Sequence, residues 1–459
     1  MPSPRNALAA IFPTLLLATL SPLFAVDDGG VLDHGTYPFD LGPTASDIGS
    51  AVAILPDGRI LLAGTVASGS TNVAALVRLL PDGSPDLTFG AGTGRVVNPC
   101  SLFLPSSART LHLLDGGRIL LGGSLLYGSS GDILVWRLEE DGACDATFGE
   151  FGIQGIPFDL GGDEMDTGSA LAVDSLGRIV VAGTAEFAGS DTDIAVARLL
   201  PGGGLDPSFS GDGKMTIPFD LTGAHLDAGL AVALDRDDRI VVAGAAFDAS
   251  GGDYEIAVAR VAGNGELDET FGDSGRRSLA FDLGGSNNEF ARGVALWPDG
   301  EIVLVGPLAT GPSVQEWQVV RLAADGDIVL GATHGQYFSS PSDASAVVLQ
   351  GDGKITFAGF GMGSTSPDFG IGRLLRDGTP DPSFALGWGV TTFDFAWGGS
   401  NVDAANAIAL DHDGRIVAAG QAEFDAPDND FAWLRIESSY IFADGFEWGD
   451  TSRWSATAP

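Results

Sequence analysis

The sequence predicts an all-β protein: a seven-bladed β-propeller of four-stranded antiparallel blades, its ring closed between the N- and C-terminal segments. The main observation is a run of a basic residue, Ile, aliphatic residues and a final Gly that returns about every 60 residues. Its copies are Arg59–Gly64, Arg118–Gly123, Arg178–Gly183, Arg239–Gly244, Glu301–Gly306, Lys354–Gly359 and Arg415–Gly420. Each copy is followed, 19 to 21 residues after its start, by an Arg that precedes Leu, Ile or Val. Seven units of this kind must stack to bury a common core, which indicates one repeat architecture.

The composition favours strands over helices in every unit. Glycine makes up 67 of the 459 residues, and the aliphatic runs between the glycines are short. This combination is typical of short strands joined by tight turns. No long stretch of the chain after residue 25 has the 3.6-residue apolar period of a helix.

The third unit illustrates the expected blade. Its predicted strands are Ile156–Asp159, Ser169–Val173, Arg178–Gly183 and Ile194–Leu200. We take Ile156–Asp159 to be the innermost strand. The stretch GGGLDPSFSGDG after the fourth strand carries no strand pattern, and similar stretches follow most other units. We therefore expect it to run from the outermost strand of one blade to the innermost strand of the next.

The two ends of the repeat region complement each other. Asp28–Asp33 resembles part of this connecting stretch, whereas the last unit ends at Arg435–Ile436 without one. A closed ring between these segments removes exposed sheet edges. The rival architecture is a parallel β-helix, whose rungs are usually much shorter than 60 residues and need no hairpin turns, so we prefer the propeller.

The repeat resembles a known one. The run Arg178–Gly183, the strand DIAVARL (Asp193–Leu199) and the stretch NGELDETFG together resemble the delta-60 repeat of exported bacterial proteins over roughly residues 28 to 436. The departures are Glu301 in place of a basic residue and Leu330 in place of the Phe of the connecting stretch. The resemblance implies a propeller-like repeat protein without an established biochemical activity.

Charge excludes one class of partner. The net charge is −38, with only 23 Lys and Arg. Nucleic-acid binding requires clustered basic residues, and 13 of these 23 occupy the two repeated positions, so we expect no nucleic-acid partner. Such an acid excess suits an exported protein or one that attracts cations.

The ends of the chain predict export. Residues 1–25 have a basic residue, an apolar core and a final small residue, as a signal peptide does, and an N-terminal membrane anchor is the alternative. We expect the propeller to span residues 26–436 and a short tail to span 437–459. The tail, which contains IFADGFE, resembles segments on exported proteins of Gram-negative bacteria. The expected location is therefore periplasmic, cell-surface or extracellular, with no membrane span after cleavage, and we expect a monomer.

Two cysteines, Cys100 and Cys144, lie in the second unit. Export would permit a disulfide between them, and two buried free thiols are the alternative. Closing a loop of about 45 residues would stabilise the fold by roughly 4 kcal/mol on the chain-entropy model.

The repeated Arg of the fourth predicted strand is expected to be structural. A guanidinium among Ala, Val and Leu needs a carboxylate, and an Asp lies eight residues further along the chain in most units. The expected pairs are Arg78–Asp86, Arg137–Asp145, Arg198–Asp206, Arg260–Asp268 and Arg373–Asp381. For Arg435 the expected partner is Asp33, at the other end of the chain.

A first set of acids closes the first predicted strand of five units: Asp40, Asp159, Asp220, Asp282 and Asp394. If that strand is innermost, the carboxylates ring one mouth of the channel, and oxygen ligands suit a hard cation such as Ca²⁺. The alternative is that each Asp accepts backbone N–H bonds in its turn.

A second set of acids precedes the second predicted strand: Asp47, Asp166, Asp227, Glu289 and Asp403. We expect these acids on the same face as the first set, together with the variable loops between the third and fourth predicted strands. Variable loops on one face suggest a ligand-binding face, and a solvated acidic rim is the alternative.

Catalytic patterns are weak. The five His residues occupy unrelated positions in their units, and no Ser lies in a GxSxG elbow. The function predicted is a non-enzymatic binding scaffold for a protein or glycan partner, without a cofactor. The alternatives are a Ca²⁺-dependent ligand- or glycan-binding module and a hydrolase with a metal in the channel.

Overall fold

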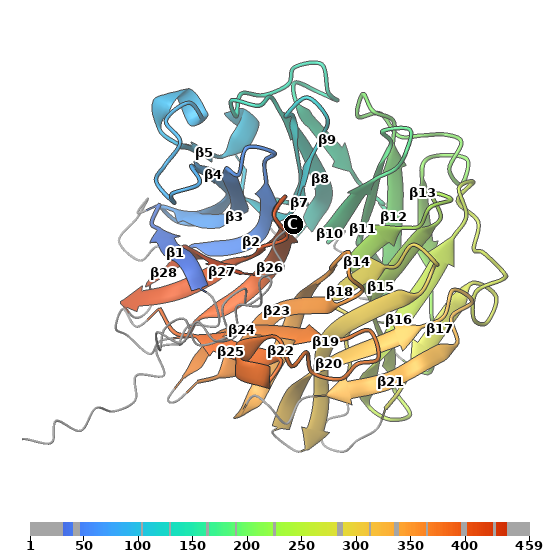
Figure 1. The fold of residues 1–459 in the computed structure, drawn as a ribbon. Helices are drawn as coiled ribbons and strands as arrows, with labels where there is room; N and C mark the ends of the chain where they lie inside the picture. The colour runs from blue at the N-terminus through green and yellow to red at the C-terminus, as the bar shows by residue number, and fades with distance from the viewer. Residues whose placement is uncertain are drawn as a thin grey trace, which may run out of the picture.

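The structure, a computed structural model, is a ring of seven four-stranded sheets around a central axis (Figure 1). It describes residues 31–39, 46–101, 104–127, 130–161, 165–188, 191–223, 226–281, 288–311, 314–334, 339–363, 366–395, 402–425 and 428–437. The predicted signal peptide and all of the predicted tail except its first residue lie outside these ranges. The predicted seven-bladed, four-stranded propeller is confirmed.

The first four blades follow one another along the chain. Blade 1 contains β2 (Ile48–Ile54), β3 (Ile60–Ser68), β4 (Thr71–Leu79) and β5 (Arg95–Val97). Blade 2 contains β6 (Ser106–Leu113), β7 (Ile119–Tyr127), β8 (Ser130–Leu138) and β9 (Ile153–Ile156). Blade 3 contains β10 (Thr167–Val173), β11 (Ile179–Phe187), β12 (Asp191–Leu199) and β13 (Lys214–Ile217). Blade 4 contains β14 (Asp227–Leu234), β15 (Ile240–Asp248), β16 (Asp253–Val261) and β17 (Arg276–Leu279).

The last three blades complete the ring. Blade 5 contains β18 (Gly293–Leu296), β19 (Ile302–Gly311), β20 (Val314–Leu322) and β21 (Ile328–His334). Blade 6 contains β22 (Ser339–Leu349), β23 (Ile355–Met362), β24 (Pro367–Leu374) and β25 (Val390–Phe393). Blade 7 contains β26 (Ala404–Leu410), β27 (Ile416–Asp425), β28 (Asp428–Ile436) and β1 (Val31–Tyr37). The only helical segments in the described ranges are the 3₁₀ turns η1 (Gly90–Gly92), η2 (Pro99–Ser101) and η3 (Ala385–Gly387).

The structure corrects the predicted order of strands within a blade. Ile153–Ile156 is the outermost strand of blade 2, and the innermost strand of blade 3 is β10, which contains Ser169–Val173. The stretch after β12 is therefore a connection within blade 3 to its own outermost strand. The inter-blade link is the segment that follows β9. A tandem repeat in sequence has no intrinsic starting point, so its period fixes the set of strands but not where each sheet begins.

The strands are apolar at almost every position because neighbouring blades cover both faces of each blade. In β12, Ile194 and Val196 pack in the core between blades 3 and 4, whereas Ala195 and Ala197 pack in the core between blades 2 and 3. Side chains alternate between the two faces of a strand, so both sets must be apolar. Seven such cores lie between the blades around the ring.

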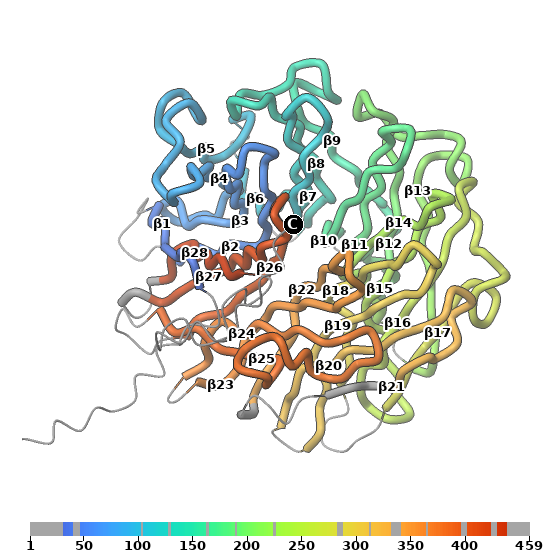
Figure 2. The backbone as a smooth tube through the Cα atoms, in the orientation of Figure 1, coloured from blue at the N-terminus to red at the C-terminus, as the bar shows by residue number. Residues whose placement is uncertain are grey.

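The predicted closure of the ring is confirmed. Strand β1 pairs antiparallel with β28 as the outermost strand of blade 7, with Asp33 opposite Arg435 and Tyr37 opposite Phe431. The two strands lie side by side in Figure 2, where β1 is blue and β28 is red. The predicted pair is also present, with Arg435 Nη2 3.3 Å from Asp33 Oδ2.

The repeated Arg forms the predicted ion pairs. The Nε atoms of Arg78, Arg137, Arg198, Arg260 and Arg373 lie 2.7–2.8 Å from the Asp eight residues later. Each guanidinium also lies over the Phe of the same connection, as Arg198 does over Phe209 at 4.8 Å. Arg198 Nη1 donates to Gly263 O of the next blade at 2.6 Å, so this Arg joins neighbouring blades as well as closing its own.

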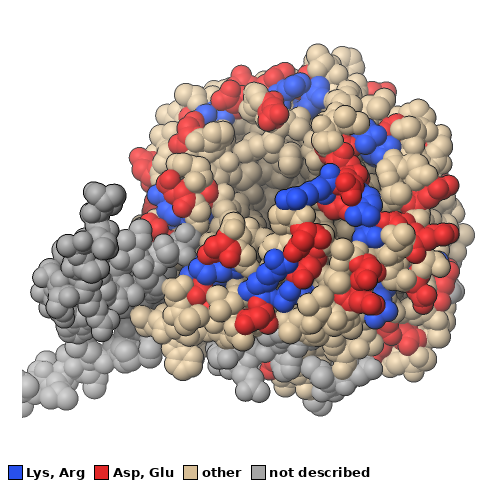
Figure 3. All heavy atoms as spheres, turned by 45° about the vertical axis from the view of Figure 1, so that its right-hand side comes forward, with Lys and Arg blue, Asp and Glu red and all other residues tan. Residues whose placement is uncertain are grey.

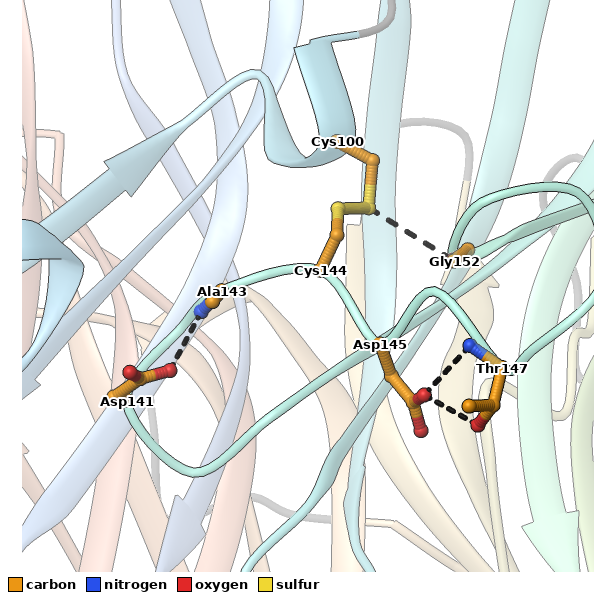
Figure 4. Close-up of a disulfide and its surroundings, with 7 residues drawn as sticks. All are labelled: Cys100, Asp141, Ala143, Cys144, Asp145, Thr147 and Gly152. Carbon is orange, nitrogen blue, oxygen red and sulfur yellow. Dashed lines mark hydrogen bonds between the residues drawn. A yellow bond between two sulfur atoms is a disulfide. The ribbon is translucent and has the colours of Figure 1, made fainter.

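A disulfide joins Cys100 to Cys144, with their Cα atoms 5.4 Å apart. Cys100 lies in η2, after the last strand of blade 1, and Cys144 lies in the connection between β8 and β9 of blade 2. Figure 4 shows the bond beside the turn in which Asp145 accepts hydrogen bonds from Thr147. The disulfide therefore crosslinks two neighbouring blades at their outer side. In the described ranges there is no helix of the length and apolarity that crossing a membrane would require.

Candidate functional site

One end of the ring, which we call the link face, carries the inter-blade links and the hairpins between second and third strands. The link after β9 forms a bridge with the hairpin of blade 3 through Leu160 and Phe187, and Thr222 and Asp248 do the same one blade later. The opposite end, the turn face, carries the turns between first and second strands and the start of each connection to the outermost strand. The predicted grouping of acidic links with variable hairpins on one face is therefore found in the structure.

The first set of predicted acids lies on the link face but not at the channel. Asp159, Asp220 and Asp394 are exposed and follow the outermost strands β9, β13 and β25. None of them is among the residues that line the channel. The expectation that they ring its mouth was wrong, because it depended on taking the outermost strand for the innermost one. Asp40 and Asp282 lie outside the described residues.

The second set of acids is buried rather than exposed. Asp47, Asp166, Asp227, Glu289 and Asp403 have exposed fractions of 0–1%. They lie where each link enters the innermost strand, as predicted. Their side chains accept backbone hydrogen bonds: Asp166 Oδ2 accepts from Phe158 N at 2.7 Å and Oδ1 accepts from Glu186 N at 3.1 Å. The structure thus gives these acids a role in holding the links, and ligand binding by them stays a prediction.

The same clamp is repeated around the ring. In every case the acid accepts from the backbone N–H of the Phe eight residues before it, and these Phe residues are Phe39, Phe158, Phe219, Phe281 and Phe395. Asp47 and Asp403 also accept from the second strand, through Ala67 N and Glu423 N. Buried acids thus hold the inter-blade links in place, because a carboxylate that is removed from water must be hydrogen-bonded.

The structure brings the two predicted sets together and adds a third acid that sequence reasoning missed. Carboxylate oxygens of Asp368, Asp394 and Asp403 all lie within 4.8 Å of one another. Asp368 comes from β24, Asp394 from the link and Asp403 from the start of the next blade. A signal was present, because the position five residues before the repeated Arg is acidic in six units: Asp132, Asp193, Glu255, Glu316, Asp368 and Asp430.

Burial and crowding raise the pKa values of two of these carboxyl groups. Burial, and then the nearby Asp394 and Asp403, raise the pKa of Asp368 to about 7. Burial also raises the pKa of Asp403 to about 6. At the interface between blades 3 and 4, burial and the carboxylates of Asp227 and Asp220 raise the pKa of Asp193 to about 6. A charged group that loses water and gains like-charged neighbours prefers its neutral form, unless a cation is present.

The central channel differs in character from the acidic link face. The first strands of all seven blades line a cavity of about 240 Å³. Among the residues that the structure describes, its lining contains no Asp, Glu, His or Cys, and the only charged members are Arg109 and Arg292. Figure 3 shows a hollow at the centre of one face of the ring, walled by uncharged residues and surrounded by acidic and basic ones.

A β-bulge shapes the channel wall in blade after blade. The pairing of first and second strands skips one residue, which is Ser50, Arg109, Ser169, Leu230, Ser345 or Asn406 according to the blade. In blade 5, Arg292 holds the equivalent place just before Gly293, which pairs with Val305. All seven residues line the channel. Bulges re-aim side chains, so this ring of residues is a built feature of the fold.

The bulge explains the Gly that ends every repeated run. A Cβ at Gly183 would lie 1.9 Å from Thr167 O, two residues before the bulge, and one at Gly244 would lie 1.8 Å from Ala228 O. The same close approach of the inner strand is found at Gly64, Gly123, Gly306, Gly359 and Gly420. Only a residue without a side chain fits beneath that carbonyl oxygen.

Several solved structures are similar to this chain at low sequence identity. A protein of unknown function from Dyadobacter fermentans is 14% identical, covers 89% of this chain and 98% of its own, and has a TM-score of 0.44. Sqt1 from Chaetomium thermophilum is 13% identical over 86% of this chain and 96% of its own, with a TM-score of 0.45. PorZ, a surface component of the type-IX secretion system of Porphyromonas gingivalis, is 10% identical over 86% of this chain and 47% of its own, with a TM-score of 0.43. Likeness at this level carries nothing about ligands or partners.

Comparison with curated proteins gave no match. A family model does match, under the description "Domain of unknown function (DUF5122) beta-propeller", at residues 55–89, 117–148, 177–209, 236–271 and 350–384. These segments run from the turn before the second strand to the Phe of the connection in blades 1, 2, 3, 4 and 6. The description does not carry the delta-60 name. Five segments of the chain, which together make up less than half of it, are thus similar to the repeats of a β-propeller family.

Proposed function

We propose that this protein is an exported, non-enzymatic binding scaffold whose link face engages a positively charged partner. The observation that supports the proposal is the set of exposed carboxylates Asp159, Asp220 and Asp394, which occupy equivalent places in the inter-blade links. Each lies beside a buried acid that fixes the link through backbone hydrogen bonds. The exposed charges are therefore presented from a rigid frame, and preorganised charges lose little entropy on binding.

The test uses a decalysine peptide as the probe, in isothermal titration calorimetry at 0.15 M NaCl. The triple variant Asp159→Asn, Asp220→Asn, Asp394→Asn removes three charges from the link face. A matched control, Asp82→Asn, Asp141→Asn, Asp377→Asn, removes three exposed charges from the turn face. We expect the first variant to weaken binding at least tenfold and the second to change it less than twofold. Equal losses in both variants would show only general attraction to an acidic protein and would refute a link-face site.

A second candidate is Ca²⁺-dependent binding of a ligand or glycan on the same face. The convergence of Asp368, Asp394 and Asp403 within 4.8 Å supports this candidate, because Ca²⁺ is held by several carboxylate oxygens. Asp193, Asp220 and Asp227 are the equivalent acids at the interface of blades 3 and 4, where burial and the neighbouring Asp227 and Asp220 raise the pKa of Asp193. With Ca²⁺ at 100 times its Kd, each site would add about 2.7 kcal/mol to the unfolding free energy.

Thermal melts in EDTA and then in excess Ca²⁺ test this candidate. The expected result is a higher melting temperature in Ca²⁺, with a smaller rise in Asp394→Asn and an unchanged rise in the control Asp115→Asn, an exposed turn residue. An identical melting temperature with and without Ca²⁺ would remove the candidate. The channel hydrolase receives no support from the first set of acids, since those that the structure describes do not line the channel.

A further inference from the structure

We propose that the central channel is a binding site for a small oxyanion, a carboxylate, sulfate or phosphate group, held between Arg109 and Arg292. This site is distinct from the acidic link face and would take a ligand of the opposite charge. Nothing in the repeat pattern requires either residue, because the bulge position that they occupy is Ser, Leu or Asn in the other blades.

The first argument is the sign of the charge. The protein has 61 acidic residues and 23 basic ones, yet the described part of the channel lining contains two Arg and no acid. Most other basic side chains are engaged at repeated structural positions. At physiological salt the Debye length is about 8 Å, so charges on the outer surface of the ring are largely screened from an anion inside the channel.

The second argument is the state of the two guanidinium groups. Arg109 is exposed to the channel and makes no hydrogen bond or ion pair with any residue in the described ranges. Arg292 Nη1 lies 2.7 Å from Asp343 Oδ2, and this Asp is buried while the Arg side chain is 45% exposed. Asp343 therefore holds one N–H group of the Arg292 guanidinium, and the other N–H groups of this guanidinium are available to a ligand.

The third argument is geometry. The first strands follow one another around the ring, and blades 2 and 5 are three places apart among seven, so Arg109 and Arg292 approach the channel from nearly opposite sides. Hydroxyl groups of Ser50, Ser169 and Ser345 share the ring. The cavity of about 240 Å³ is smaller than the usual 300–1,000 Å³ of sites for drug-sized molecules, so the ligand is small. Guanidinium forks bind carboxylate, sulfate and phosphate in the same bidentate way.

The test is isothermal titration calorimetry of the whole propeller with sodium sulfate, inorganic phosphate and D-galacturonate, each at constant ionic strength against sodium chloride. We expect saturable binding of at least one probe, and the probe that binds identifies the group. Arg109→Gln should weaken this binding at least tenfold. The control Arg236→Gln, which removes the same charge from an exposed turn outside the channel, should leave it within twofold.

A second variant keeps the proposal testable if Arg109→Gln folds poorly. Ser169→Asp places a carboxylate on the same ring of bulge residues and should also weaken binding at least tenfold through repulsion. No saturable binding of any probe overturns the proposal. Binding that survives both channel variants overturns it as well, because the anion would then sit elsewhere. Neither result depends on the decalysine titration, so this site and the link face can fail independently.

Discussion

At the level of single residues, blade 5 shows how a lost charge is replaced. Val329 stands where most blades have the Asp that pairs with the repeated Arg. Glu301 occupies the position that is basic in the other units, and its Oε2 lies 2.7 Å from Arg321 Nη2. Trp297 lies 5.3 Å from Arg321 and takes the place of the missing Phe. In blade 5 the carboxylate and the aromatic ring that contact Arg321 thus come from Glu301 and Trp297, which precede β19, and not from the connection after β20.

Removing the carboxylate of Glu301 should therefore uncover a nearly buried guanidinium. We expect Glu301→Gln to lower the unfolding free energy by roughly 2–3 kcal/mol, because a charged hydrogen bond is lost and Arg321 stays largely buried. Adding Val329→Asp should restore part of this loss, since it rebuilds the pairing of the other blades. Urea unfolding measures both effects, with Glu269→Gln, an exposed residue of a connection in blade 4, as the control. If Val329→Asp gives no recovery in the Glu301→Gln background, the exchange of partners is not the explanation.

Both departures were visible in the sequence, but their connection was not. Glu301 and Leu330 stood out from the repeat, whereas the pairing of Glu301 with Arg321 depends on the register of β19 against β20, where Val303 lies opposite Arg321. The pairs at a fixed spacing of eight residues, such as Arg198 with Asp206, were predictable because both partners belong to one short connection. Contacts between segments that are close in the chain are read more easily than contacts across strands.

At the level of the strand, the bulge and its Gly form one device. The bulged first strand turns a side chain into the channel and drives a carbonyl oxygen against the second strand, where Gly183 and its six equivalents accept it. The repeated Gly was the strongest signal in the sequence, yet its reason was hidden. The bulge residue itself varies from Ser to Arg, so no pattern pointed to the ring that it forms.

A side chain at this Gly should be costly even when it is a single methyl group. The Cβ of Gly183→Ala would meet Thr167 O at 1.9 Å, so either the backbone or the bulge must shift. Overpacking of this kind usually costs about 1–3 kcal/mol, and we expect a loss in that range or above it in urea unfolding. Gly202→Ala is the matched control, because a Cβ there would meet nothing within 4 Å. A loss no larger than that of the control would show that the bulge relaxes freely.

The sequence predicted most of the strands but not the point in the repeat at which each blade begins. In the third unit three predicted strands overlap β10, β11 and β12, whereas the predicted strand Ile156–Asp159 shares only Ile156 with β9. The sequence also contains no mark of which strand faces the axis, because an antiparallel sheet has hairpins at every step. That one uncertainty moved Asp159, Asp220 and Asp394 from the channel to the outer part of the link face. It also concealed the meeting of both acid sets, since Asp394 and Asp403 approach each other only when the link joins two blades.

At the level of the whole molecule, two populations of carboxyl groups oppose each other in their effect on stability. Asp193, Asp343, Asp368 and Asp403 have pKa values raised to about 6 or 7 in the folded protein, with burial as the largest cause. The folded state therefore binds more protons than the unfolded state, and stability falls as the pH rises from about 4 to 7. In contrast, the pKa of Asp145 is lowered to about 2 by hydrogen bonds to Thr147 and by Arg137, which outweigh its burial, so its contribution is lost only in strong acid.

Thermal melts in EDTA should consequently give a higher melting temperature at pH 5.0 than at pH 7.5. The net charge of −38 at neutral pH acts in the same direction through self-repulsion. Asp368→Asn separates the two effects, because it removes a crowded buried charge: it should raise the melting temperature at pH 7.5 and leave it nearly unchanged at pH 5.0. Asp115→Asn, with the same change of charge at an exposed turn, should do neither. A melting temperature that is lower at pH 5.0 would contradict the assignment of these raised pKa values.

Closure of the ring also sets an order of events when the chain is made. Of the strands that the structure describes, β1 is synthesised first, yet its partner β28 is synthesised last. Blades 1 to 6 contain only strands that are consecutive in the chain, so each can form as it emerges. The first strand instead has no strand to pair with until the chain has been synthesised past residue 436. The nascent protein therefore has one unpaired strand, β1, for almost the whole of its synthesis, and this strand can pair only at the last step.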